Sequence, residues 1–166
     1  MADLTTLESK LGEVTGLAMA AQDLTKKVAT MVKKEKEHVE LVGTLEQMRK
    51  EAAETQERCE EVASGLDGKK AAILKKARET KKEAQEMAKT YLGSDADALD
   101  GFEFMTMAEA GEVGHWGVVT EMAKNAKQRD LQALARWATP IQKRHFDTTL
   151  KGSLALARSQ DPNEEE

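Results

Sequence analysis

Apolar residues recur at spacings of three and four along almost the whole chain, which is the period of an amphipathic α-helix. Two glycine-containing loops, SGLDG and GSDADALDG, interrupt the pattern. It therefore predicts two helical segments before residue 64 and three more over residues 69–92, 101–126 and 129–158. We expect an all-α fold, with four long antiparallel helices plus an additional helix. In the segment 69–92 the inward-facing residues are expected to be Ile73, Leu74, Ala77, Ala84, Met87 and Tyr91.

The charged cluster KKEKE, residues 33–37, separates the first two apolar sets. It is either a connection between two helices or a charged stretch of one long helix. One unbroken helix from residue 4 to residue 63 would be about 90 Å long at 1.5 Å per residue. We therefore favour a break in this cluster.

Pro140 interrupts the pattern of the last segment. Proline lacks the backbone N–H that a helix interior needs, but it is tolerated in the first turn. Two arrangements are open: the helix is kinked at Pro140, or a new helix begins there with Thr139 as its N-cap.

Length and charge narrow the class of protein. The 166 residues suffice for one domain, which we place at residues 1–158, and the polar tail SQDPNEEE (159–166) is expected to be disordered. The net charge of −5 argues against general nucleic-acid binding. The basic stretch KKAAILKKARETKK (69–82) lacks interleaved aromatic residues, so we interpret it as a solvated helix face or a salt-bridge partner for acidic helices.

Several common features are missing from the sequence. The chain does not begin like a signal peptide, and no run approaches the roughly 18 apolar residues of a membrane span. The single cysteine, Cys59, excludes an internal disulfide and lies on an apolar face, where we interpret it as a core thiol. We expect a cytoplasmic protein without a membrane partner.

The stretch GEVGHWG, residues 111–117, places an acid and an imidazole on a helix with three glycines. Steps of three and four from Ala108 reach Glu112 and then His115, so the pair is expected on the buried face of its helix. A buried carboxylate is costly unless a charge, a hydrogen bond or a metal ion compensates it. Since the two side chains leave the same face, they are candidates for binding one metal ion.

The last segment repeats this arrangement with Gln142 and His145, which are also spaced by three residues. His145 occupies an inward position near the middle of its helix. If the last two helices are antiparallel neighbours, as their short connection indicates, His115 and His145 lie at similar depth.

The three glycines Gly111, Gly114 and Gly117 are expected to remove side-chain bulk, so that a neighbouring backbone, a metal ion or a small substrate can approach. Close helix packing without a ligand is the other interpretation. Gly12 and Gly16 form a similar pair of small residues in the first segment.

A further acid and imidazole, Glu35 and His38, occur at the same spacing in the charged cluster and just after it. They face the bundle if the helix is continuous, and lie solvated at a bundle end if the chain turns. Other carboxylates that could complete a site in mid-bundle are Glu8, Glu13, Glu54, Glu57, Glu79 and Glu83.

With inward Glu-x-x-His and Gln-x-x-His on successive helices, the sequence resembles the ferritin-like superfamily, and most of all the bacterial stress-type (YciF-like) ferritin-like proteins. The similarity covers most of the chain, including EKEHVELVGTLEQM (35–48), AEAGEVGHWGVV (108–119) and PIQKRHF (140–146). The resemblance implies a four-helix bundle that holds a di-iron or di-manganese centre.

Carried over to this chain, the resemblance implies that Glu112 and His115 form one ligand pair and that His145 is the histidine of the other. Gln142 stands where the family has a glutamate, and could instead support a ligand by hydrogen bonding. Glu35 and His38 are additional candidates.

The expected function is therefore that of a ferritin-like bundle that binds iron or manganese. Such a bundle reacts with dioxygen or peroxide, or handles iron under stress, and whether it is a metal-dependent oxidoreductase is left open. Its expected partners are a metal ion and a small oxidant, and a homo-oligomer is compatible with the sequence. The alternative is a non-enzymatic interaction or stress-structural protein without metal.

Overall fold

The computed structural model describes residues 2–165 and contains five α-helices in this part of the chain, with no strand. These are α1 (Thr6–Glu35), α2 (Glu40–Ser64), α3 (Lys70–Tyr91), α4 (Ala98–Asn125) and α5 (Arg129–Ser159). The all-α class and the five predicted segments are confirmed.

The helix ends follow local capping chemistry. Thr5 and Glu8 form a capping box at the start of α1, and Asp97 and Asp100 form another at the start of α4. The expected break between the first two helices is confirmed, because Lys36 and His38 both have positive φ angles, 61° and 50°. A left-handed residue ends a helix, so α1 stops after Glu35 and the chain reverses into α2.

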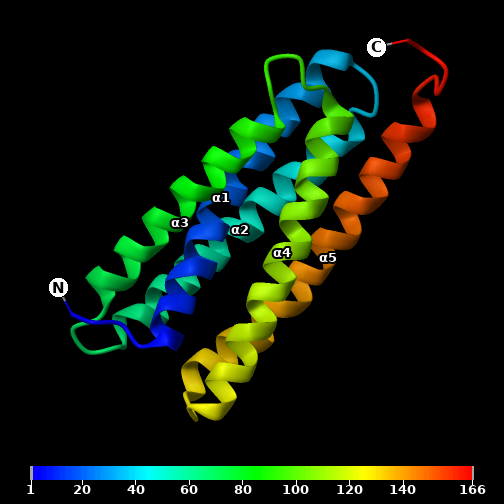
Figure 1. Ribbon diagram of the computed structural model, residues 1–166. Helices are drawn as coiled ribbons and strands as arrows, with labels where there is room; N and C mark the ends of the chain where they lie inside the picture. The colour runs from blue at the N-terminus through cyan, green and yellow to red at the C-terminus, as the bar shows by residue number, and fades with distance from the viewer. Residues whose placement is uncertain (1, 166) are drawn as a thin grey trace.

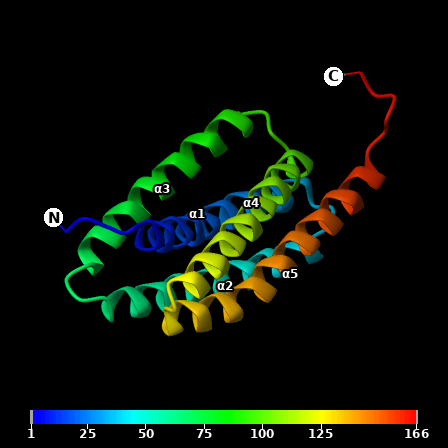
Figure 2. The ribbon, with the colours of Figure 1, turned by 60° about the horizontal axis from the view of Figure 1, so that its bottom comes forward.

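The helices alternate in direction, each running antiparallel to the one before it (Figure 1). Four of them form a bundle in which α1 contacts α2 and α4, while α5 contacts α4 and α2. The additional helix, α3, packs on the outside of this bundle, mainly against α1. Figure 2 shows α3 on the side of α1 that faces away from α5.

Two glycines of α1 allow this outer packing. A Cβ atom at Gly12 would lie 2.8 Å from the Cβ of Lys76, and one at Gly16 would overlap the carbonyl oxygen of Ala77. Only glycine permits the backbones of α1 and α3 to approach this closely. The pairing of Gly12 and Gly16 in the sequence therefore marks where α3 docks.

The second half of α3 is less buried than its periodicity predicted. Ile73 and Ala77 are fully buried, but Met87 and Tyr91 are 54% and 59% exposed. The prediction that these last two face inward is wrong, because α3 packs on the outside of the four-helix bundle, mainly against α1. The Tyr91 ring instead stacks against Phe104 of α4 at 5.3 Å.

Pro140 lies inside α5, which continues without interruption from Arg129 to Ser159. The alternative of a new helix that begins at Pro140 is wrong. The hydroxyl of Thr139 donates a hydrogen bond to the carbonyl of Ala135, one turn earlier, and does not cap a new helix.

The interior of the bundle contains two apolar clusters, one toward each end. The first contains Leu11, Cys59, Trp116 and Leu131, among others. The second contains Val28, Leu45, Phe102 and Leu156, among others. Because successive helices are antiparallel, the segments between the two clusters meet at mid-bundle, and the candidate site lies there.

The chain after α5 contains no helix over residues 160–165, and these residues are exposed. Met1 and Glu166, which belong to the predicted domain and tail, lie outside the described residues. None of the helices in the described part of the chain has an apolar stretch of the length that crossing a bilayer requires.

Candidate functional site

Five polar side chains from three helices occupy the middle of the bundle. We call them the polar layer, and they are Glu51 of α2, Glu109 and Glu112 of α4, and Gln142 and His145 of α5. Glu109, Glu112 and His145 are only 2%, 6% and 4% exposed. Charged side chains are seldom buried this deeply without partners, so the layer is a specific feature of the interior.

His145 lies between two carboxylates. Its Nε2 is 2.6 Å from Oε2 of Glu51, and its Nδ1 is 3.7 Å from Oε2 of Glu109. Burial lowers the pKa of His145, but the carboxylates of Glu109 and Glu51 outweigh burial, and the net pKa is raised. The imidazole therefore holds its proton more firmly than a free histidine does.

Glu51 is the most accessible member of the layer and has partners outside it. Its Oε1 accepts hydrogen bonds from Nη2 of Arg144 at 2.6 Å and from Nε2 of Gln47 at 3.1 Å. Burial raises the pKa of Glu51, while the hydrogen bond from His145 is the strongest of several contacts that together lower it. Glu51 thus remains a carboxylate at neutral pH.

Glu109 and Glu112 are neighbouring acids one turn apart on α4. The amide Nε2 of Gln142 donates a short hydrogen bond to Oε2 of Glu109. For the carboxyl of Glu112, in contrast, no hydrogen bond is formed with any residue in the range 2–165. Burial, and then repulsion from Glu109, raise the pKa of Glu112 well above its usual value. This acid has no positive partner that compensates its burial.

A cavity of about 510 Å³ opens beside these two acids, between α1, α3 and α4. Glu109 and Glu112 both line it, as do His115 and Gly111. The layer is therefore reached from outside through the cavity, although its side chains are almost completely buried.

The structure corrects the expected position of His115. Its side chain is 40% exposed and its Nδ1 lies 3.6 Å from Oε2 of Glu13 on α1, so it does not face the interior with His145. Glu13 also pairs with Lys10 at 2.7 Å. The structure brings Glu112, Gln142 and His145 into one layer, and it leaves His115 at the wall of the cavity.

Glu35 and His38 lie at the end of the bundle, as predicted for a chain that turns there. The Oε1 of Glu35 accepts a hydrogen bond of 2.6 Å from the backbone N–H of Ala98, at the start of α4. The ring of His38 contacts Ser159 at 2.7 Å and Glu40 at 3.3 Å. Both residues form hydrogen bonds at helix ends and lie away from the polar layer.

The glycines of GEVGHWG do not act as expected. A Cβ atom at Gly111, Gly114 or Gly117 would meet nothing within 4 Å. All three are exposed on the outer side of α4, so no neighbouring backbone approaches them. Gly111 alone borders the cavity, where it leaves open space.

Sequence reasoning missed Glu109 and Glu51. Counting in steps of three and four from Met105 reaches Glu109, Glu112, Trp116 and Val119, which are all buried. The count from Ala108 also reaches Glu112, but it continues with a step of three and so selected His115. Glu51 lies three residues after Met48, at the edge of the buried face of α2, where the pattern alone does not separate it from surface glutamates.

The donor chemistry of the layer suits iron or manganese, since carboxylates and imidazole are common ligands of both metals. As the side chains stand, however, no group of three or more His, Cys, Asp or Glu residues in the range 2–165 is arranged to hold a metal ion. His145 is one reason, because Glu51 and Glu109 already face both of its ring nitrogens.

None of the buried residues of α1 is an acid or a histidine; they are apolar residues, glycines and threonines. The layer therefore lacks one of the four helices as a source of ligands.

No family model matches the sequence, and neither a curated protein nor a solved structure matches it.

Proposed function

We propose that the protein is a metal-binding bundle of the ferritin-like type, which takes up iron or manganese at the polar layer. The observation that carries this proposal is the pair Glu109 and Glu112, two buried acids three residues apart on α4, of which Glu112 has no hydrogen-bonding partner in the range 2–165. A buried carboxylate is costly unless a hydrogen bond, an opposite charge or a metal ion compensates it. The cavity beside the pair provides a path for the ion.

The arrangement of helices supports the same class. In ferritin-like proteins the ligands project inward from the helices of a four-helix bundle, near its middle. Here α2, α4 and α5 supply Glu51, the two acids and His145. Because α1 buries no acid or histidine, we expect one ion per chain and not a full two-metal centre.

Each residue would have a distinct role. Glu109, Glu112 and His145 would hold the ion, and Gln142 would orient Glu109 through the hydrogen bond that it already donates. His145 would release its proton on binding, so uptake should be weaker at acidic pH. The bound metal would supply redox chemistry toward dioxygen or peroxide.

Metal titration of the purified full chain tests the proposal. Anaerobic calorimetry with Fe(II), and separately with Mn(II), should show one binding event per chain. Glu112→Gln and His145→Gln should each weaken it by at least about tenfold. Glu54→Gln is the matched control, because Glu54 pairs with Arg58 on the surface of α2 and should bind like the wild type.

Absence of binding by the wild-type chain, or equal binding by all four proteins, would reject the metal function. A second function would then be favoured, that of a metal-free helical interaction protein. The contacts of His145 with both Glu51 and Glu109 support this second function, because they compensate the imidazole without an ion. It predicts that melting is unchanged when a chelator is added.

A further inference from the structure

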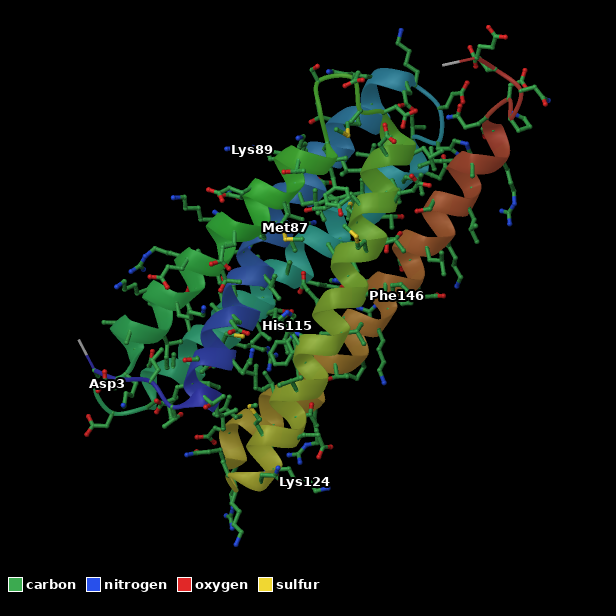
Figure 3. All side chains as sticks on the ribbon, viewed as in Figure 1. Asp3, Met87, Lys89, His115, Lys124 and Phe146 are labelled. Carbon is green, nitrogen blue, oxygen red and sulfur yellow. The ribbon has the colours of Figure 1, made fainter. Side chains whose placement is uncertain are left out.

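The cavity beside the polar layer has apolar walls as well as an acidic floor. Its walls are formed by Leu17, Ala20 and Leu24 of α1, Met87 of α3, and Phe104 and Met107 of α4. Figure 3 labels Met87 on α3 and His115 on α4, which lie on the two sides of this space, with α1 between them. Met87 and Met107 are 54% and 43% exposed, so two flexible apolar side chains remain available at the mouth.

The size of the cavity, about 510 Å³, lies in the range of small-molecule sites. Glu109 and Glu112 are buried residues that line it, and Glu112, which is 6% exposed, forms no side-chain hydrogen bond with any residue in the range 2–165. An apolar molecule alone would leave this acid uncompensated. A molecule with a positive group at one end and an apolar body would satisfy both parts of the cavity.

The charged side chains at the mouth of the cavity do not change its preference for a positively charged ligand. Nζ of Lys27 is 3.4 Å from the backbone carbonyl of Leu92, and Asp23 is paired with Lys81 at 3.0 Å. Lys89 also borders the cavity, at its exposed rim. A fatty carboxylate could pair with these lysines or with His115, which lies 3.6 Å from Glu13, and would leave the acids at the floor without a counter-charge.

We propose that this cavity binds an amphipathic organic cation, an alkylammonium compound whose ammonium group pairs with Glu109 and Glu112 and whose chain lies along α1 between Met87 and Phe104. This inference concerns a different ligand from the metal of the proposed function, although the two share Glu109 and Glu112. It does not require His145 or Glu51.

Calorimetry with three probes of equal chain length tests the inference on the full protein in the presence of a chelator. We expect n-octylammonium to bind, and n-octanol and n-octanoate to bind at least about tenfold more weakly. Glu112→Gln should lower the affinity for octylammonium by about tenfold or more and leave octanol unchanged. Equal or tighter binding of octanoate would instead assign the cavity to a fatty acid held at the rim, and would overturn the proposal.

A pair of glycine variants tests whether octylammonium binds in the cavity or elsewhere on the surface. Gly111→Leu places a side chain into the cavity without a clash, while Gly114→Leu makes the same change on α4 away from it. Both substitutions improve helix propensity, so both variants are expected to fold. Octylammonium binding should be lost in the first and unchanged in the second. Equal binding in both would overturn the proposal.

The two proposals can fail independently. His145→Gln should weaken metal uptake by at least about tenfold and still bind octylammonium, because Glu112 and the cavity walls are unchanged. Gly111→Leu should abolish octylammonium binding, whereas Gly114→Leu should not. A chain that binds octylammonium but no metal would keep this inference and reject the proposed function.

Discussion

The Nε2 atom of His145 on α5 lies 2.6 Å from a carboxylate oxygen of Glu51 on α2. This contact joins two helices that are far apart in the sequence, at a level where the apolar clusters do not reach. Since the other ring nitrogen faces Glu109 of α4, one imidazole connects three of the four bundle helices. The polar layer thus has a structural role whether or not an ion binds to it.

Removing the Glu51 carboxylate should destabilise the fold. In Glu51→Gln the buried imidazole loses its closest negative partner, and we expect the free energy of unfolding to fall by about 1–3 kcal/mol. Urea denaturation measures the change. The control Glu54→Gln, which removes an exposed pair with Arg58, should shift it by less than about 0.5 kcal/mol. Equal effects of the two variants would contradict a special role for Glu51.

The raised pKa values of His145 and Glu112 predict a loss of stability toward alkaline pH. Protonated His145 contributes stability that is complete below its unfolded pKa of 6.5 and is lost as the pH rises through its higher folded pKa. For Glu112 the folded state favours the neutral acid, so stability is lost as the pH rises from 4.5 through its raised pKa.

Thermal unfolding from about pH 6 to pH 9 with a chelator present should therefore show a falling melting temperature. The fall should be smaller in Glu112→Gln, which carries no acid at this position. Glu51 affects stability at acidic pH instead, because its pKa is lowered in the folded state. Its contribution to stability is present above pH 4.5 and is lost as the pH falls through its lower folded pKa. A wild-type chain whose stability rises steadily toward pH 9 would contradict the directions given for both groups.

Gly16→Ala should destabilise the protein although alanine is the better helix former. The new methyl group would overlap the carbonyl oxygen of Ala77, and the clash should cost about 1–3 kcal/mol. At Gly114 the same substitution meets open space and should stabilise by about 0.5–1 kcal/mol. In chemical denaturation, the changes in the free energy of unfolding of the two variants have opposite signs if α3 docks at Gly16. They have the same sign if it does not.

Cys59 should be unreactive in the folded protein. It is fully buried, and burial raises the pKa of its thiol to about 12, so very little thiolate is present at neutral pH. A maleimide reagent added to the native chain should label it slowly, and the same reagent in denaturant should label it at once. Rapid labelling without denaturant would show that the first apolar cluster opens readily.

The order and type of the helices were predictable because apolar spacing and loop residues are local signals. The break after Glu35 was also predictable, from the length that an unbroken helix would have. That α5 continues through Pro140 was not predictable, because the packing of α5 against its neighbours decides whether the helix tolerates the missing N–H. Similarly, Met87 and Tyr91 follow the period of a buried face, but whether that face is covered depends on which helices surround α3.

The site was predicted only in part. Glu112 and His145 were expected inside and are buried, whereas His115 was placed inside by a step of three from Glu112 where the buried face takes a step of four. A helix turns by 100° per residue, so this difference is enough to exchange an interior position for one at the edge. Glu109 could have been found by starting from Met105, but selecting Glu51 required knowledge of which helix faces His145.

The outer position of α3 has a consequence for how the molecule moves. This helix is attached through its first half, by the close approach at Gly12 and Gly16, while its second half has few buried side chains. Amide hydrogens near Met87 should therefore exchange with solvent sooner than those of α1 beside them. Because Met87 forms part of the cavity wall, any outward displacement of this end of α3 would widen the entrance for a ligand.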